Sequence, residues 1–425
     1  MRNTVTLRIF TLGFALLFAM CQAHAQTPVA PTNTDESRVP TFELPDPLIT
    51  TDGRVVDTQE MWFNVRRPEL LELIRNEMFG RLSLEGLSFA RGDFETVPVF
   101  DGLGLRIQYR LVVFRRGSGL EPRVIDVLTY TPNTDEIVPA FLALNFRGNH
   151  TIHHDPGIWE GNVYPLRGPQ ERGNHTESWQ VEKLLSRGYA LVTAQFQDVE
   201  QDNRELAHIN SVRRFIEQSG DPSDGKSIAT WAAMLSVMLD FIEEDYNRGV
   251  LNIDPTKVAV FGHSRLGKTA LWAGANDERF GMVISNNSGA GGAALARRQF
   301  GETVHRVNTS FPHWFADNFK KYNLDVNSMP FDMHSLISLI APRPVYVASA
   351  TLDTWADPRG EFLSAFHADP VYRLLGTDGI RGVTEMPPPD FSIGGTIGYH
   401  VRTGRHDVLE FDWEQYIDFA DRHFR

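Results

Sequence analysis

A serine at residue 264 stands where an apolar, strand-like segment changes into a helix-forming one. Residues 258–268 read VAVFGHSRLGK. Glycines at 262 and 267 remove the Cβ atoms that would clash in a tight turn. A serine on such a turn, the nucleophile elbow, exposes its Oγ and leaves the next backbone N–H free to bind an oxyanion. Ser264 is therefore a candidate nucleophile, although the spacing G-x-S-x-x-G also occurs in purely structural turns.

A histidine near the C-terminus is the candidate base. A serine hydroxyl is a weak nucleophile until a neighbouring imidazole accepts its proton. His406 lies in the run GRHD, after the last predicted strand and before the terminal helix. We predict His406 as the general base and interpret His400 as a histidine of the strand or of the pocket wall.

The base needs a carboxylate that orients it, on the loop after the preceding core strand. Residues 345–350 (VYVASA) form that predicted strand, and TLDTWADP follows it. Asp353 is nearer the strand end and is our first choice. Asp357 precedes Pro358, where it would equally serve as a helix cap. The order Ser, Asp, His along the chain is that of α/β-hydrolases.

Strands and helices alternate along the chain. The predicted strands cover residues 123–131, 140–146, 189–196, 258–262, 282–286, 345–350 and 395–400, and helical spacing of apolar residues marks 178–187, 228–242 and 413–424. The inner strands are nearly continuous apolar runs, as in parallel sheets covered on both faces. This pattern predicts the α/β class, an α/β-hydrolase fold in which helices cover both faces of a mostly parallel central sheet.

Two long stretches do not fit the alternation. Residues 147–177 are rich in His, Gly and Asn, and residues 201–225 are polar. Loops this long in a compact domain are usually functional. For the second stretch, a mobile surface excursion is an equal alternative.

The elbow resembles the G-C-S-R-x-G-K elbow of glucuronoyl esterases, carbohydrate esterase family 15. Further matching runs are NFRGNHT at 145–151, NSGAGGAA at 287–294, PFDMH at 330–334, APRP at 341–344, WADP at 355–358 and GRHD at 404–407. The resemblance extends from about residue 44 to the end. It implies cleavage of the ester between the 4-O-methyl-glucuronic acid of xylan and alcohols of lignin.

The resemblance also implies roles for individual residues. Ser264 and His406 would be nucleophile and base, and Arg265 would complete the oxyanion hole with its side chain and backbone N–H. The sugar would be held by three residues: Lys268, Glu302 and Trp355. The alternatives are a solvated helix lysine, a surface carboxylate and a core tryptophan, respectively.

Two positions depart from the family pattern. His263 replaces the cysteine before the nucleophile. Asn287 occupies the place where fungal members carry the triad glutamate, and an amide cannot stabilise an imidazolium by charge. The acid must then come from Asp353, as in many bacterial relatives.

A cluster at His150, His153, His154 and Asp155 raises the question of a metal. Its spacing is not a regular zinc pattern, and it lies in a Gly/Asn-rich segment. We expect neither a metal nor a cofactor.

Composition and the N-terminus restrict the class of protein. The net charge of −13 argues against a nucleic-acid partner. Positive charge, the apolar segment 9–20 and the small residues of AHA at 23–25 predict a signal peptide over residues 1–25, rather than a membrane anchor. The only cysteine, Cys21, lies inside it. We expect a disordered leader at 26–44, a single catalytic domain at 45–425, and a monomer in the periplasm or the medium.

Three functions remain open from the sequence. The first is a serine esterase acting on glucuronoyl esters. The second is another esterase of the same fold, such as an acetylxylan esterase, which would leave Arg265 and Lys268 with no acid moiety to bind. The third is a non-catalytic carbohydrate-binding relative, which would have no need of a triad.

Overall fold

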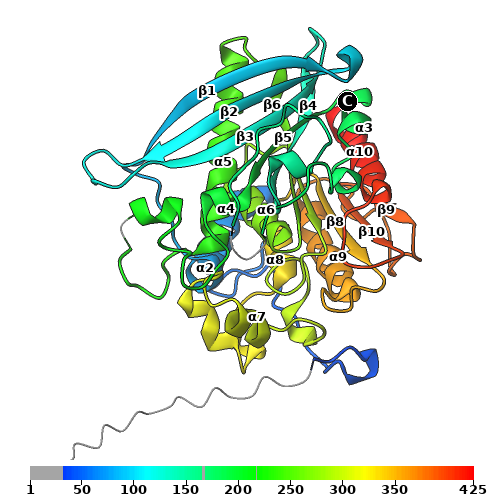
Figure 1. Ribbon diagram of the computed structural model, residues 1–425. Helices are drawn as coiled ribbons and strands as arrows, with labels where there is room; N and C mark the ends of the chain where they lie inside the picture. Colours follow the sequence, from blue (N-terminus) through cyan, green and yellow to red (C-terminus); the bar gives the residue numbers. More distant parts are fainter. Residues whose placement is uncertain (1–31, 165–167, 217) are drawn as a thin grey trace, which may run out of the picture. The chain divides into compact units, whose positions relative to one another are not determined.

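The computed structural model describes residues 32–164, 168–216 and 218–425 (Figure 1). Residues 32–425 form one unit. The predicted signal peptide lies outside the described residues. Residues 32–44 of the predicted leader are described, and they contact the domain: Glu36 pairs with Arg298 at 2.7 Å, and the carbonyl of Asn33 accepts a hydrogen bond from Gly301.

A ten-stranded sheet crosses the molecule in the order β1-β2-β3-β5-β4-β6-β7-β8-β10-β9. Its strands are β1 (Ser88–Val99), β2 (Gly104–Phe114), β3 (Arg123–Pro132), β4 (Val138–Asn145), β5 (Ala190–Gln195), β6 (Ile253–His263), β7 (Met282–Asn286), β8 (Val345–Ala350), β9 (Ser392–Gly394) and β10 (Ile397–Arg402). Six adjacent strands pair in parallel, in the order β5, β4, β6, β7, β8 and β10. The strands β1, β2, β3 and β9 are antiparallel to their neighbours.

Helices cover both faces of the sheet (Figure 1). The α-helices are α1 (Gln59–Met61), α2 (Arg67–Ile74), α3 (Val181–Ser186), α4 (Phe196–Val199), α5 (Ser227–Asn247), α6 (Arg265–Asn276), α7 (Val304–Ser310), α8 (Met333–Ser338), α9 (Pro358–Leu374) and α10 (Glu410–Phe424). Along β6, Val258 and Val260 pack into the core on the α5–α6 side, and Ala259 and Phe261 into the core on the α3–α10 side. This alternation is the period of two of a strand buried on both faces.

The predicted fold class is confirmed: the sheet is mostly parallel and lies between two helical layers. The predicted strands 282–286 and 345–350 match β7 and β8. Sequence analysis missed the β1–β2 hairpin at one edge of the sheet (Figure 1). Charged and polar residues interrupt β1, so it lacks the apolar run that marks the inner strands. Within the described residues, no helix has the length and apolar character needed to cross a bilayer.

Candidate active site

Ser264 occupies the sharp turn between β6 and α6. Its backbone has φ 59° and ψ −128°, a strained conformation for a residue with a side chain. A Cβ at Gly262 would lie 1.9 Å from the carbonyl oxygen of Leu266, and one at Gly267 would lie 2.9 Å from Ser288. Both glycines are therefore required by close approach, as expected for a nucleophile elbow. Arg265 is the first residue of α6, so its N–H has no partner inside the helix.

His406 lies on the loop after β10 and pairs with Asp353, on the loop after β8. The distance from His406 Nδ1 to Asp353 Oδ2 is 2.5 Å. Asn287 donates to the same oxygen from Nδ2 at 2.7 Å. Burial opposes ionisation of Asp353, but the hydrogen bonds from His406 and Asn287 outweigh it and lower the pKa of this carboxyl. Asp353 is thus a charged acceptor aimed at the imidazole.

Asp357, the alternative acid, is used elsewhere. It caps α9 by accepting the N–H of Gly360 at 3.0 Å, and it pairs with Arg298 at 2.8 Å. Burial raises the pKa of Asp357, against the opposing charge of Arg298. Its contacts belong to a structural ion pair and a helix cap.

The other two histidines near the base have fixed partners. His400 is fully buried in β10, 2.9 Å from the Tyr346 hydroxyl and 2.8 Å from Asp412. His263 packs against His406 with ring centroids 4.4 Å apart. Burial, and secondarily the neighbouring His406, lower the pKa of His263 to about 3. His263 is therefore neutral at neutral pH.

The seven predicted site residues come from four separate segments and line one hollow of about 290 Å³: Ser264, Arg265, Lys268, Glu302, Asp353, Trp355 and His406. Among the described residues, the Ser264 hydroxyl makes no hydrogen bond to His406, although both line this hollow. In free enzymes this contact is often long and shortens when substrate binds.

Lys268 is buried inside the wall of the hollow. Its ammonium donates to the carbonyls of Ser288 and Ala290 at 2.5 and 2.7 Å, and to Glu302 Oε2 at 3.1 Å. These bonds use all three of its donors. Lys268 therefore fixes the position of Glu302. Trp355 is 42% exposed at the edge of the hollow, so its ring is accessible to a ligand.

Two features near the site were missed by sequence analysis. Asp202, on the loop after α4, forms an ion pair with Arg265. Glu361, in α9, accepts the N–H groups of Ser288 and Gly289 at 2.6 and 3.0 Å and so holds the turn beside Asn287. The unusual length of the 201–225 stretch was the only signal that pointed toward Asp202.

A second hollow of about 390 Å³ lies on the other side of the nucleophile. It shares Ser264, Arg265 and His406 with the first hollow. Its remaining walls combine apolar side chains, among them Phe146, Trp179 and Phe261, with polar ones such as Asn145 and Ser178. Ser264 therefore lines two neighbouring hollows.

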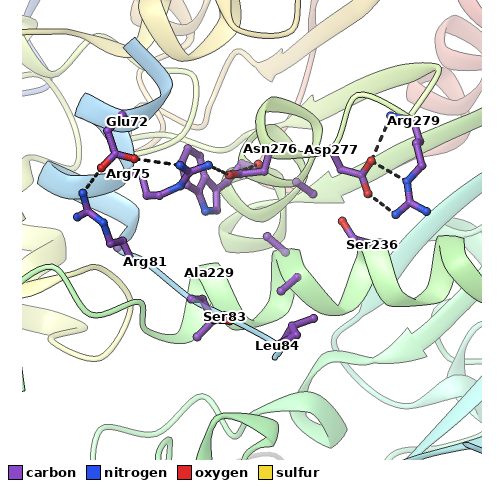
Figure 2. A pocket seen from close by; sticks show the side chains of 16 residues that line it. Glu72, Arg75, Arg81, Ser83, Leu84, Ala229, Ser236, Asn276, Asp277 and Arg279 are labelled. Carbon is purple, nitrogen blue, oxygen red and sulfur yellow. Dashed lines mark hydrogen bonds and ion pairs between the residues drawn. The ribbon is translucent and has the colours of Figure 1, made fainter. Parts of the chain in front are cut away.

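A third hollow, of about 570 Å³, contains none of the candidate catalytic residues. It lies between α5, α6 and the segment after α2 (Figure 2). Figure 2 shows its charged groups paired with one another: Glu72 bridges Arg75 and Arg81, and Asp277 pairs with Arg279. The described residues that line it include no histidine and none of the predicted site residues.

The histidine cluster of the 147–177 stretch has protein partners. Asp155 pairs with Arg106 at 2.6 Å and accepts from the Tyr130 hydroxyl at 2.8 Å. His153 lies 3.2 Å from Glu182. Within the described residues, no group of three or more His, Cys, Asp or Glu side chains is arranged to hold a metal ion.

A serine on a nucleophile elbow, beside a histidine–aspartate pair on an α/β-hydrolase sheet, is the arrangement of a serine hydrolase. Comparison with known proteins specifies the family. The family model "Glucuronyl esterase, fungi" matches residues 176–376. A carbohydrate esterase from an unknown prokaryotic organism is 42% identical over 405 residues, which cover 92% of each chain. The chain belongs to carbohydrate esterase family 15, the glucuronoyl esterases.

Two further relatives agree with this assignment. The solved structure of a glucuronoyl esterase from Solibacter usitatus is 38% identical, with a TM-score of 0.84, and the match covers 92% of this chain and 100% of that one. A 4-O-methyl-glucuronoyl methylesterase of Phanerochaete chrysosporium is 30% identical, over 84% of this chain and 68% of the relative.

Proposed function

We propose that this enzyme hydrolyses the ester between 4-O-methyl-glucuronic acid of glucuronoxylan and lignin alcohols, through an acyl-enzyme on Ser264. The observation that carries the proposal is the convergence of seven residues, from four segments, on one hollow that contains the serine. The acid part of the substrate is proposed from the relatives, which act on 4-O-methyl-glucuronoyl esters. The two hollows beside Ser264 would accommodate the acid and the alcohol parts of the ester.

In the first half of the reaction, His406 accepts the proton of Ser264 as Oγ attacks the ester carbonyl. The negative charge on the carbonyl oxygen is stabilised by the backbone N–H and the guanidinium of Arg265. Asp353 stabilises the imidazolium that forms. When the tetrahedral intermediate collapses, the carbon–oxygen bond to the alcohol breaks and His406 donates its proton to the leaving oxygen.

In the second half, a water molecule replaces the alcohol. His406 takes a proton from the water, which attacks the acyl carbonyl. The bond to Ser264 breaks, the serine regains its proton, and the free uronic acid leaves. Glu302 and Trp355, with Lys268 beside them, would hold the sugar ring, since a carboxylate accepts from sugar hydroxyls and an indole offers a flat apolar face.

The second hollow is the proposed site of the alcohol. Phe146, Trp179 and Phe261 form an aromatic part of its wall, against which an aromatic alcohol would pack. Burying a side chain of phenyl size contributes about 1.5–3 kcal/mol.

We expect benzyl glucuronate to be hydrolysed with a kcat/KM about tenfold higher than methyl glucuronate. A tenfold ratio requires about 1.4 kcal/mol, which is within the energy of burying the phenyl ring. Initial rates of uronic acid release, measured for both esters over a range of concentrations, give the ratio. Equal values of kcat/KM would show that the second hollow does not hold the alcohol.

We further propose that the enzyme is exported as a monomer to the periplasm or the medium, after cleavage behind Ala25. The charged start and apolar segment of the first 25 residues support export. N-terminal sequencing of the protein recovered outside the cytoplasm should begin at Gln26. A mature chain that still carried residues 1–25 would contradict cleavage.

A further inference from the structure

Asp202, on the loop after α4, contacts the candidate oxyanion hole. Its carboxylate forms an ion pair with Nη1 of Arg265 and accepts a hydrogen bond from the indole N–H of Trp314 at 2.7 Å. His313 Nε2 lies 2.9 Å from the same carboxylate oxygen, Oδ1. The side chain of Asp202 is only 8% exposed. A carboxylate this deeply placed is stable as an anion only because these donors surround it.

Aromatic rings surround the guanidinium of Arg265. Its Cζ lies 4.8 Å from the centroid of Trp314, 5.6 Å from Phe311 and 5.8 Å from Phe146. Among the described residues, its buried Nε has no hydrogen-bond partner. The ion pair with Asp202 thus engages one end of the guanidinium and leaves other donors to a ligand.

Hydrogen bonds to the neighbouring Glu200 hold the backbone that carries Asp202. Two residues earlier, Glu200 is fully buried and accepts from the Ser211 hydroxyl at 2.5 Å, the Ser227 hydroxyl at 2.5 Å and Arg213 at 2.8 Å. These bonds attach the beginning of the loop to its far end and to α5. Asp202 is therefore presented to Arg265 from a rigid support, which is the arrangement that precise positioning requires.

We propose that Asp202 is a positioning residue, which holds the Arg265 guanidinium so that its free N–H groups face the oxyanion of the transition state. The inference rests on the proposed function, in which Arg265 meets that oxyanion. Stabilisation of this kind is effective because the donors are oriented before the reaction begins. Without the anchor, the side chain would have to be ordered during each turnover.

The charge of Asp202 suits this role. Burial opposes its ionisation, but the hydrogen bond from His313 and the charge of Arg265 lower the pKa of Asp202 to about 2. The carboxylate therefore stays ionised, and its ion pair with Arg265 stays intact, at neutral pH.

The test is a double-mutant cycle with Asp202→Asn, Arg265→Ala and the double variant, assayed on benzyl glucuronate. Asp202→Asn keeps an acceptor for Trp314 but removes the charge that holds Arg265. We expect it to lower kcat about tenfold and to change KM less than about twofold, because the loss is confined to the transition state. In the Arg265→Ala background the same change should lower kcat less than about twofold, because its target is gone.

Glu205→Gln is the control for Asp202→Asn, and Asp202→Glu is a second variant of the same residue. Glu205→Gln, an exposed carboxylate on the same loop, should leave kcat unchanged. Should Asp202→Asn fail to fold, Asp202→Glu keeps the charge, displaces it by one methylene, and enters the same cycle. A kcat loss that is equal in both backgrounds, or no loss from either Asp202 variant, overturns the inference. A normal kcat in Arg265→Ala would instead overturn the oxyanion role of Arg265 in the proposed function.

Discussion

Replacing Ser264 with alanine is expected to abolish ester hydrolysis and to leave the fold intact. Loss of the nucleophile in a hydrolase with a catalytic triad costs roughly a millionfold in turnover. Alanine keeps a Cβ, so it is no more strained at φ 59° than the serine it replaces. The measurements are the rate of uronic acid release from benzyl glucuronate and the thermal unfolding midpoint of the purified variant.

A neighbouring serine provides the matched control. Ser178 lines the second hollow but does not lie on the nucleophile elbow. Ser178→Ala should therefore retain a kcat within a few-fold of the wild-type value. Near-normal hydrolysis by folded Ser264→Ala would remove this serine from the mechanism.

The second large effect is expected for Asp353→Asn. The asparagine side chain can still accept a hydrogen bond from His406, but it carries no charge to stabilise the imidazolium, and it can present its amide N–H to the ring instead. In the serine-protease triad the corresponding change lowers turnover about ten-thousandfold. We expect a loss of about a thousandfold to ten-thousandfold in kcat, measured with the same ester. Asn287, an amide, offers no substitute charge.

Asp357→Asn is the control for Asp353→Asn. Asparagine still caps α9 but loses the charge that pairs with the buried Arg298, and residue 357 does not line the hollow. Removing one partner of a buried ion pair costs about 3–5 kcal/mol. The variant should therefore unfold at a lower temperature while its kcat changes little. A larger kcat loss for Asp357→Asn than for Asp353→Asn would reverse the assignment of the acid.

The candidate nucleophile, base and acid could be selected from sequence because each follows closely on a core strand. The strands before Ser264 and Asp353 are apolar runs that read clearly as buried strands, and the ends of parallel strands meet at one edge of the sheet. The choice between Asp353 and Asp357 could not be made from spacing alone. It depends on the turn after β8, which directs one carboxylate to His406 and the other to Arg298.

Other parts of the site depend on long-range contacts that no local pattern encodes. Asp202 lies in an irregular loop and meets Arg265 and Trp314, which are 63 and 112 residues further along the chain. Glu361 looks like an ordinary residue in the first turn of a helix, yet it is fully buried against the turn at Ser288. In both cases tertiary packing, and not the neighbouring residues, decides what the carboxylate contacts.

The same distinction applies to Lys268. Lys268 lies one helical turn after Ser264 and lines the hollow. Its burial, and its bonds to the carbonyls of Ser288 and Ala290, could not be inferred. A substitution there would disturb the wall of the hollow as well as any sugar contact. Trp355, which is partly exposed, is the better position at which to test sugar binding.

The most direct test of the account is Trp355→Ala, assayed in parallel on benzyl glucuronate and on an aryl acetate. Stacking on an aromatic face contributes about 1 kcal/mol beyond the area it buries. We predict that KM for the glucuronate rises about tenfold while kcat changes little, and that kcat/KM for the acetate stays within about twofold, because the acetate has no ring to hold. Leu352→Ala, an exposed apolar residue of the same loop that does not line the hollow, should leave both substrates unaffected. If Trp355→Ala impairs acetate and glucuronate equally, the tryptophan is structural and the hollow beside Ser264 is not the site of the sugar acid.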